Sequence, residues 1–147
     1  ALNETVNDAN LVKISDSNKW TIFTKTEFGF EPYYLGNIKT NSKNQLCAAI
    51  DYSLSSTINT DRIQVFIFDG KTATQIKGEN TLGVKTIAVD NNDNIWCCNY
   101  GGFSVFDGEK WTVINDEKFS KNGVFTIAQA PDNKMWIGTG NGIYINN

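Results

Sequence analysis

The sequence contains no histidine among its 147 residues, and this absence excludes several kinds of catalysis. A Ser-His-Asp or Cys-His arrangement needs an imidazole ring to take the proton of its nucleophile, so the chain can form neither. Histidine is also a frequent zinc ligand, and the three cysteines alone are too few for a metal site. We therefore expect no metal, no cofactor and no catalytic residues.

Arginine is almost as scarce, because Arg62 is the only one, and the lysines are scattered singly. The net charge is -3 and the isoelectric point is about 4.9. Binding to a nucleic acid duplex needs clustered positive charge, so we exclude nucleic acid as a partner. The sequence also lacks any apolar run near the roughly 18 residues of a membrane span, so we expect no span in this chain.

Cysteine occurs three times, as Cys47, Cys97 and Cys98. An odd number at these positions is not a disulfide framework. Cys97 and Cys98 are adjacent in a strand-like run, so their side chains should point to opposite faces of a sheet. We expect buried free thiols, because free cysteine is commonly buried.

The rest of the composition is that of an ordinary globular protein, with 40% apolar and 20% charged residues. A length of 147 residues fits a single domain with a sizeable core, so we treat residues 1–147 as one domain.

A repeated pattern dominates this domain. Each copy has an alternating stretch, several turn residues and a short apolar stretch, which together predict a β-hairpin. The copies are NIKTNSKNQLCAA at 37–49, TIAVDNNDNIWCC at 86–98 and TIAQAPDNKMWIG at 126–138.

A second pattern alternates with the hairpins. Short strand-like runs flank turns centred on Asp16, Asp69 and Asp107, and aspartate favours such turns because its carboxylate accepts bonds from nearby backbone amides. Each unit thus has four short strands and no helical periodicity. The units repeat near 40 residues, with an insert at 51–62 lengthening the first. This pattern predicts an all-β fold of four-stranded antiparallel β-propeller blades.

The segment VFTIAQAPDNKMWIGTGNGIY at 124–144 resembles the two-component regulator propeller repeat. Ala130 and Asn133 depart from the family's Asp and Gly, and Cys47 stands where the first unit should have tryptophan. The residues in register with the family are Val124, Ile127, Met135, Trp136, Ile137, Gly138, Thr139, Gly142 and Ile143, and in the preceding unit Val84, Ile87, Asp90, Ile95, Trp96 and Gly102.

The resemblance implies a location outside the cytoplasm, periplasmic or at the cell surface. Such repeats are typical of sensor regions of hybrid two-component systems in Bacteroides-like bacteria, especially those that sense glycans. Those receptors continue into a membrane span and kinase modules, which this sequence does not contain. The resemblance therefore implies a sensor-type module and leaves the signalling step aside.

The strand pattern predicts just over three blades. A partial blade lies at 11–23, full blades at about 34–77 and 84–114, and an incomplete blade at about 124–147. Closed propellers have about 4–8 blades, so either the chain is a piece of a longer protein or copies complete one another. We favour a homodimer of about six blades, in which Trp20–Phe23 of a partner supplies the missing last strand.

Function in repeat scaffolds tends to lie in segments that do not repeat. Two such segments are FGFEPYY at 28–34 and the insert at 51–62. In the first, the aromatic residues could instead cap the core or line a subunit contact. Tyrosine and arginine are favoured at recognition surfaces, and the candidate ligand-binding residues are Tyr33, Tyr34, Tyr52, Arg62 and Tyr100.

Recurring residues are interpreted as structural. DNNDN at 90–94 spaces its oxygens like a calcium loop but lacks the required glycine and glutamate, so we predict a plain turn. The recurring tryptophans, Trp20 with Trp111 and Trp96 with Trp136, are expected to pack blade against blade rather than to stack on sugars.

We expect a non-catalytic recognition or assembly module, whose ligand is a glycan or another protein. The alternative is a carbohydrate-binding module that uses surface aromatics. A glycan-active enzyme needs only two facing carboxylates, but no pair among the 16 acidic residues stands out.

Overall fold

The computed structural model describes residues 11–14, 19–29, 35–50, 65–78, 84–99 and 101–146. These residues form antiparallel sheets with two short helices. Blade 1 is β1 (Leu11–Ile14) and β2 (Trp20–Phe23), blade 2 is β3 (Leu35–Thr40), β4 (Leu46–Ile50), β5 (Val65–Phe68) and β6 (Ala73–Gln75), and blade 3 is β7 (Thr86–Val89), β8 (Ile95–Asn99), β9 (Gly102–Phe106) and β10 (Trp111–Ile114). Blade 4 is β11 (Val124–Gln129), β12 (Met135–Thr139) and β13 (Gly142–Asn146), and the helices are α1 (Lys25–Phe28) and α2 (Glu117–Ser120).

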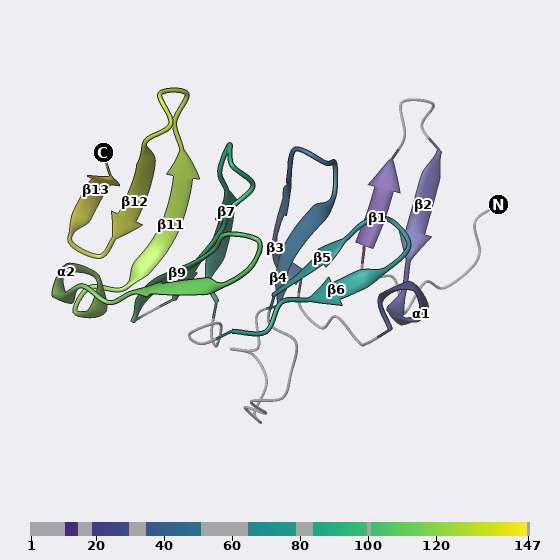
Figure 1. Ribbon diagram of the computed structural model, residues 1–147, viewed down its shortest axis with the longest axis horizontal. Helices are drawn as coiled ribbons and strands as arrows, with labels where there is room; N and C mark the ends of the chain where they lie inside the picture. The colour runs from purple at the N-terminus through teal and green to yellow at the C-terminus, as the bar shows by residue number, and fades with distance from the viewer. Residues whose placement is uncertain are drawn as a thin grey trace.

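The four blades stand side by side in chain order along an open arc (Figure 1). Within each blade the strands pair in sequence order, and β7 lies beside both β3 and β11. The first strands of blades 2 to 4 therefore follow one another along the arc. This arrangement confirms the predicted propeller blades, and the predicted outer strands at 11–14 and 20–23 coincide with β1 and β2.

The hairpin turns form where the sequence places Asn and Asp. Asn44, Asp93 and Asn133 occupy equivalent positions and have φ of 56°, 63° and 66°. This left-handed conformation is one that Asn and Asp tolerate better than most residues. Each first hairpin of a blade thus turns through the same backbone geometry.

The turns between third and fourth strands also have the predicted chemistry. Asp69 Oδ1 accepts hydrogen bonds from the backbone N–H of Lys71 and Thr72, and Asp107 Oδ1 accepts from Glu109 and Lys110. These bonds hold the pKa of both carboxyls below their ordinary value. The third predicted turn, at Asp16, lies outside the described residues.

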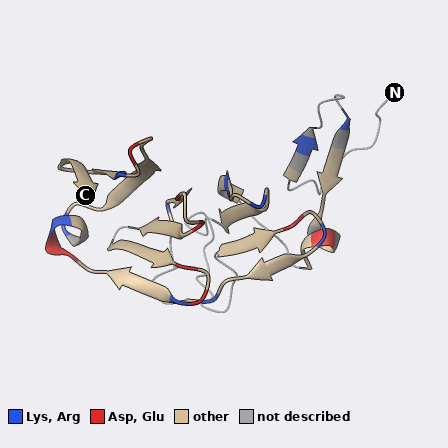
Figure 2. Ribbon diagram, turned by 45° about the horizontal axis from the view of Figure 1, so that its top comes forward, with Lys and Arg blue, Asp and Glu red and all other residues tan. Residues whose placement is uncertain are grey.

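The core lies between blades rather than within one sheet. Neighbouring blades press apolar faces together, so three clusters separate blades 1 and 2, 2 and 3, and 3 and 4. Within the described strands only β1 and β3 carry a charged residue, Lys13 and Lys39. Figure 2 shows the charges gathered mainly in turns and in the short helices.

The cysteines are buried free thiols, as expected. Cys97 faces the cluster between blades 2 and 3, whereas Cys98 faces the one between blades 3 and 4. Burial raises the pKa of Cys47 to about 11 and that of Cys98 to about 12. The pKa of Cys97 is also raised by burial. These thiols pack as small apolar side chains.

Candidate functional site

The five predicted ligand-binding residues, Tyr33, Tyr34, Tyr52, Arg62 and Tyr100, all lie outside the described residues. They remain predictions. The aromatic stretch at 28–34 contributes one described aromatic side chain, Phe28, which is 3% exposed. Its ring centroid lies 5.6 Å from that of Phe66 and 4.8 Å from that of Phe68. Phe28 therefore caps the core between blades 1 and 2.

The hairpin tips of successive blades are bonded to one another. The backbone N–H and hydroxyl of Ser42 donate to the carboxylate of Asp93 over 2.7 and 2.6 Å. Asn91, in the position of Ser42, donates through its side chain to Oδ1 of Asn133 over 2.6 Å. In blade 4 this donor position is Pro131, which has no N–H. The tip-to-tip bonding therefore has no backbone donor at that position.

DNNDN at 90–94 forms a turn, as predicted. The Asp90 carboxylate accepts from the backbone N–H of Asn92 and Asn94, the Asn94 amide and the indole Nε1 of Trp96. Its lone pairs are thus used by the protein itself. Among the described residues, no group of three or more His, Cys, Asp or Glu could hold a metal ion.

Two of the recurring tryptophans pack between blades, as predicted. Trp96 packs against the cluster between blades 3 and 4, and Trp111 against the cluster between blades 2 and 3. The indole Nε1 of Trp111 donates to the carbonyl of Lys77 over 2.9 Å. The prediction is wrong for Trp136, which is 44% exposed. No described blade lies beyond it, and the side chain of Trp20 lies outside the described residues.

A groove of about 540 Å³ lies between blades 1 and 2. Its walls are mainly apolar side chains, including Leu11, Ile38, Leu46 and Phe68, and Lys13 stands at the β1 side. It has the size of a typical small-ligand pocket and the apolar character of one.

Three equivalent isoleucines show why this groove exists. Ile87 and Ile127 are 0% and 4% exposed. The preceding blade's first two strands lie against the strand of each, since β3 and β4 lie against β7, and β7 and β8 lie against β11. Ile38 has the same position in blade 2 but is 48% exposed. Blade 1 has third- and fourth-position strands only, within the described residues. The groove is therefore the space that two inner strands would fill.

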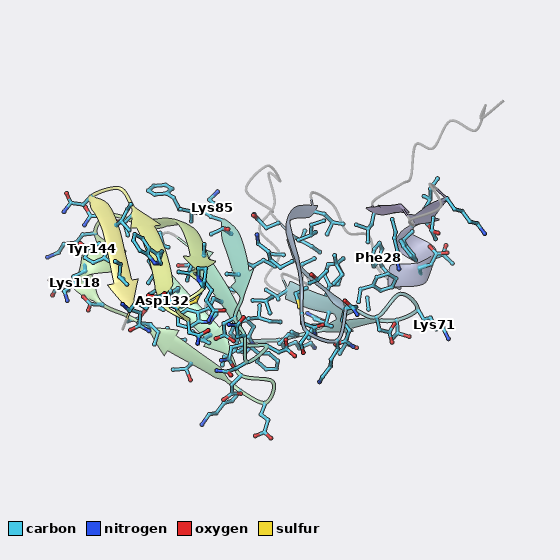
Figure 3. All side chains as sticks on the ribbon, turned by 90° about the horizontal axis from the view of Figure 1, so that it is seen from above. Phe28, Lys71, Lys85, Lys118, Asp132 and Tyr144 are labelled. Atoms are coloured by element: carbon cyan, nitrogen blue, oxygen red, sulfur yellow. The ribbon has the colours of Figure 1, made fainter. Side chains whose placement is uncertain are left out.

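A second hollow of about 320 Å³ lies at the other end of the arc. Trp96, Phe119 and Tyr144 form aromatic walls, while Asp116 and Lys118 add charge. The Phe119 and Tyr144 ring centroids are 5.3 Å apart, and Figure 3 shows Tyr144 and Lys118 at the same end of the molecule. Blade 4 has no fourth strand within the described residues, and this hollow lies where that strand would stand.

Blade 4 also exposes an apolar face. Trp136, Ile143 and Ile145 are 44%, 68% and 45% exposed. Their equivalents one unit earlier, Trp96, Phe103 and Val105, all belong to the packing between blades 3 and 4. The exposed face of blade 4 is thus a blade-packing surface with no described blade against it. We call it the terminal face.

No helix among the described residues is long and apolar enough to cross a membrane. Among curated proteins, none matches the chain. The extracellular domain of BT3049, named as a hybrid two component system of B. thetaiotaomicron, is 21% identical with a TM-score of 0.66. The match covers 95% of this chain but 18% of that one.

The extracellular domain of BT4673 from B. thetaiotaomicron, named as a one component system, is 20% identical with a TM-score of 0.47, over 88% of this chain and 23% of that one. Residues 118–141 match the two component regulator propeller family. This segment contains β11 and β12 and the central part of the repeat described from the sequence. The chain therefore carries a two-component regulator propeller repeat, and its fold is that of β-propeller blades.

Proposed function

We propose that the chain is a non-catalytic recognition module that acts outside the cytoplasm and binds polypeptide in extended form at the groove. The observation that carries the proposal is the exposure of Ile38, 48%, against 0% and 4% for the equivalent Ile87 and Ile127. The chain itself covers this position with strands wherever it can. A strand or hairpin is therefore the ligand that best fits the groove.

The edge of β1 supports the same proposal. Within the described residues β1 pairs with β2 alone, through four residue pairs beginning at Leu11 and Phe23. Its other edge faces the groove side and offers N–H and C=O groups to an added strand. Strand addition derives affinity from such backbone bonds and specificity from pockets for alternate side chains. The apolar groove floor supplies the pockets.

The location and the lack of catalysis rest on the comparisons. The protein of similar fold is named as the extracellular domain of a two-component system, not as an enzyme. The chain spans less than a fifth of that protein's length, so what the whole receptor senses is a separate matter. The proposal for this chain concerns binding by its own blades.

A labelled peptide tests the proposal. We would titrate a fluorescent peptide of residues 124–139, the β11–β12 segment, into a Trp136→Asp chain whose own terminal face is disabled. Saturable binding is expected, weakened at least about tenfold by Ile38→Asp. Ile22→Asp is the matched control, because Ile22 is 41% exposed but does not line the groove. Absence of binding, or equal loss in both variants, would contradict the proposal.

The aromatic walls of the second hollow favour one other function, carbohydrate binding. Aromatic faces beside charged groups suit the apolar faces and hydroxyls of a sugar. Oligosaccharides would then quench tryptophan fluorescence, because Trp96 lines the hollow. Tyr144→Ala should remove the quenching while leaving thermal unfolding nearly unchanged. No quenching by any glycan class would eliminate this alternative.

A further inference from the structure

We propose that the ligand of the groove is the β11–β12 hairpin of a second copy, so that one blade is built from two chains. The inference rests on the proposed function and names its partner. In the joint blade β11 and β12 of one copy hold the two inner positions. β1 and β2 of the other copy hold the two outer positions. The groove and the terminal face are then two halves of one contact.

The equivalence of positions carries the first step. In blade 3 the second-strand residue Trp96 packs toward the next blade, and Trp136 has that place in blade 4. The surface that receives it in the next blade includes the first-strand isoleucine, which in blade 2 is the exposed Ile38. One copy therefore displays an unused donor surface at one end and the matching unused acceptor surface at the other.

The strand count shows which strand gives way. A blade has one third position, and both β1 and β13 hold it in their own sheets. Leu11 of β1 packs into the cluster between blades 1 and 2, so β1 is anchored. β13 is exposed along most of its length, with Ile143 at 68% and Tyr144 as its half-buried residue. β1 of the partner therefore replaces β13 beside β12.

This exchange also accounts for the second hollow. When β1 takes the third position next to β12, β2 takes the fourth position beside the third blade. The second hollow lies there, between blade 3 and the third strand of blade 4. One rearrangement thus fills both hollows. It differs from adding β2 alone, because the inner edge of β2 is already paired with β1.

The register of the joint blade follows from blade 3. There Val105, next to last in its strand, lies opposite Trp96. Lys13 is next to last in β1, and Trp136 has the place of Trp96. The junction therefore sets Lys13 of one copy opposite Trp136 of the other. A two-fold axis makes both junctions identical and closes the pair.

Mass measurement and cross-linking test the inference on the full 147-residue chain. We expect twice the chain mass, and Ile38→Asp or Trp136→Asp should weaken the dimer at least about tenfold. Ile143→Asp should leave it unchanged, because β13 leaves the contact. A monomer at all concentrations, or loss of the dimer in Ile143→Asp, overturns the proposal.

The paired variant Lys13→Cys with Trp136→Cys should form an intermolecular disulfide. Opposite residues in antiparallel strands have Cα atoms about 4.5–5.5 Å apart, within the range that disulfides span. Thr21→Cys with Trp136→Cys is the control, because Thr21 lies one strand further out. Equal cross-linking in both pairs overturns the register. If the peptide binds but the chain stays monomeric, this inference fails while the proposed function stands.

Discussion

At the scale of single residues, one substitution separates two equivalent tryptophans. Asp90 fixes the Trp96 indole with a 2.9 Å hydrogen bond. The equivalent residue beside Trp136 is Ala130, which has no acceptor in its side chain. The sequence predicted that both tryptophans share a slot. It could not predict that one is exposed, because exposure depends on what stands opposite.

Exchanging these two residues should change stability in opposite directions. Asp90→Ala leaves the Asn94 amide and the Trp96 indole without their acceptor, so we expect unfolding to become easier by about 1–3 kcal/mol. Ala130→Asp supplies an acceptor near Trp136 and should add up to about 1 kcal/mol. Denaturant unfolding followed by tryptophan fluorescence measures both. An Ala130→Asp chain less stable than the original would show that the two slots are not equivalent.

The thiols give a second prediction at this scale. Burial raises the pKa of Cys47 to about 11 and that of Cys98 to about 12, so both are protonated at neutral pH. A thiol-specific chromogenic disulfide should therefore react slowly with the folded chain and label all three cysteines rapidly in denaturant. Rapid labelling of one thiol under native conditions would reveal local opening of a blade contact.

At the scale of elements, the sequence predicted most of the strands because their signals are local. The Asn and Asp turns and the alternating runs place β1, β2 and the hairpins closely. The helices α1 and α2 were not predicted, since four residues are too few for helical periodicity. A signal was present for α2, because Asp116 caps it by accepting from the Lys118 N–H.

Gly78 tests how one element fits its neighbour. A Cβ on Gly78 would overlap the Trp111 ring, and the Trp111 indole bonds to the adjacent Lys77 carbonyl. Gly78→Ala should push the ring away, break that bond and cost about 1–3 kcal/mol, with a red-shifted tryptophan emission. Gly101→Ala is the control, because its new Cβ meets nothing closer than 3.5 Å. Equal effects would argue against tight packing of Trp111.

At the scale of the whole molecule, the blades form an open crescent whose two ends expose apolar surface (Figure 2). The sequence predicted the blade number and the incomplete ends. It did not predict the groove, since the groove arises from an uncovered Ile38 rather than from any motif. The non-repeating tyrosines stay predictions, because they lie outside the described residues.

Acid stability belongs to this scale because one carboxylate chemistry recurs along the arc. Backbone hydrogen bonds hold the pKa of Asp69 and Asp107 below the ordinary 3.8. Their contribution is therefore complete above pH 3.8 and is lost as the pH falls through the lower folded values. The melting temperature, followed by circular dichroism, should fall progressively in this acid range.

The matched variant is Asp107→Asn, which keeps an acceptor oxygen for the turn but does not titrate. Its melting temperature should decline less steeply with acid than that of the original chain. An identical acid profile would show that other groups control the loss.

Pro131 has a mechanical consequence. The tips of blades 2 and 3 are each fastened to the next blade by a donating residue, and the tip of blade 4 has proline at that position. A ring closed from two copies would thus have two seams without that fastening, on opposite sides. Dilution or mild heating would split it along those seams into intact halves, long before any blade lost its strands.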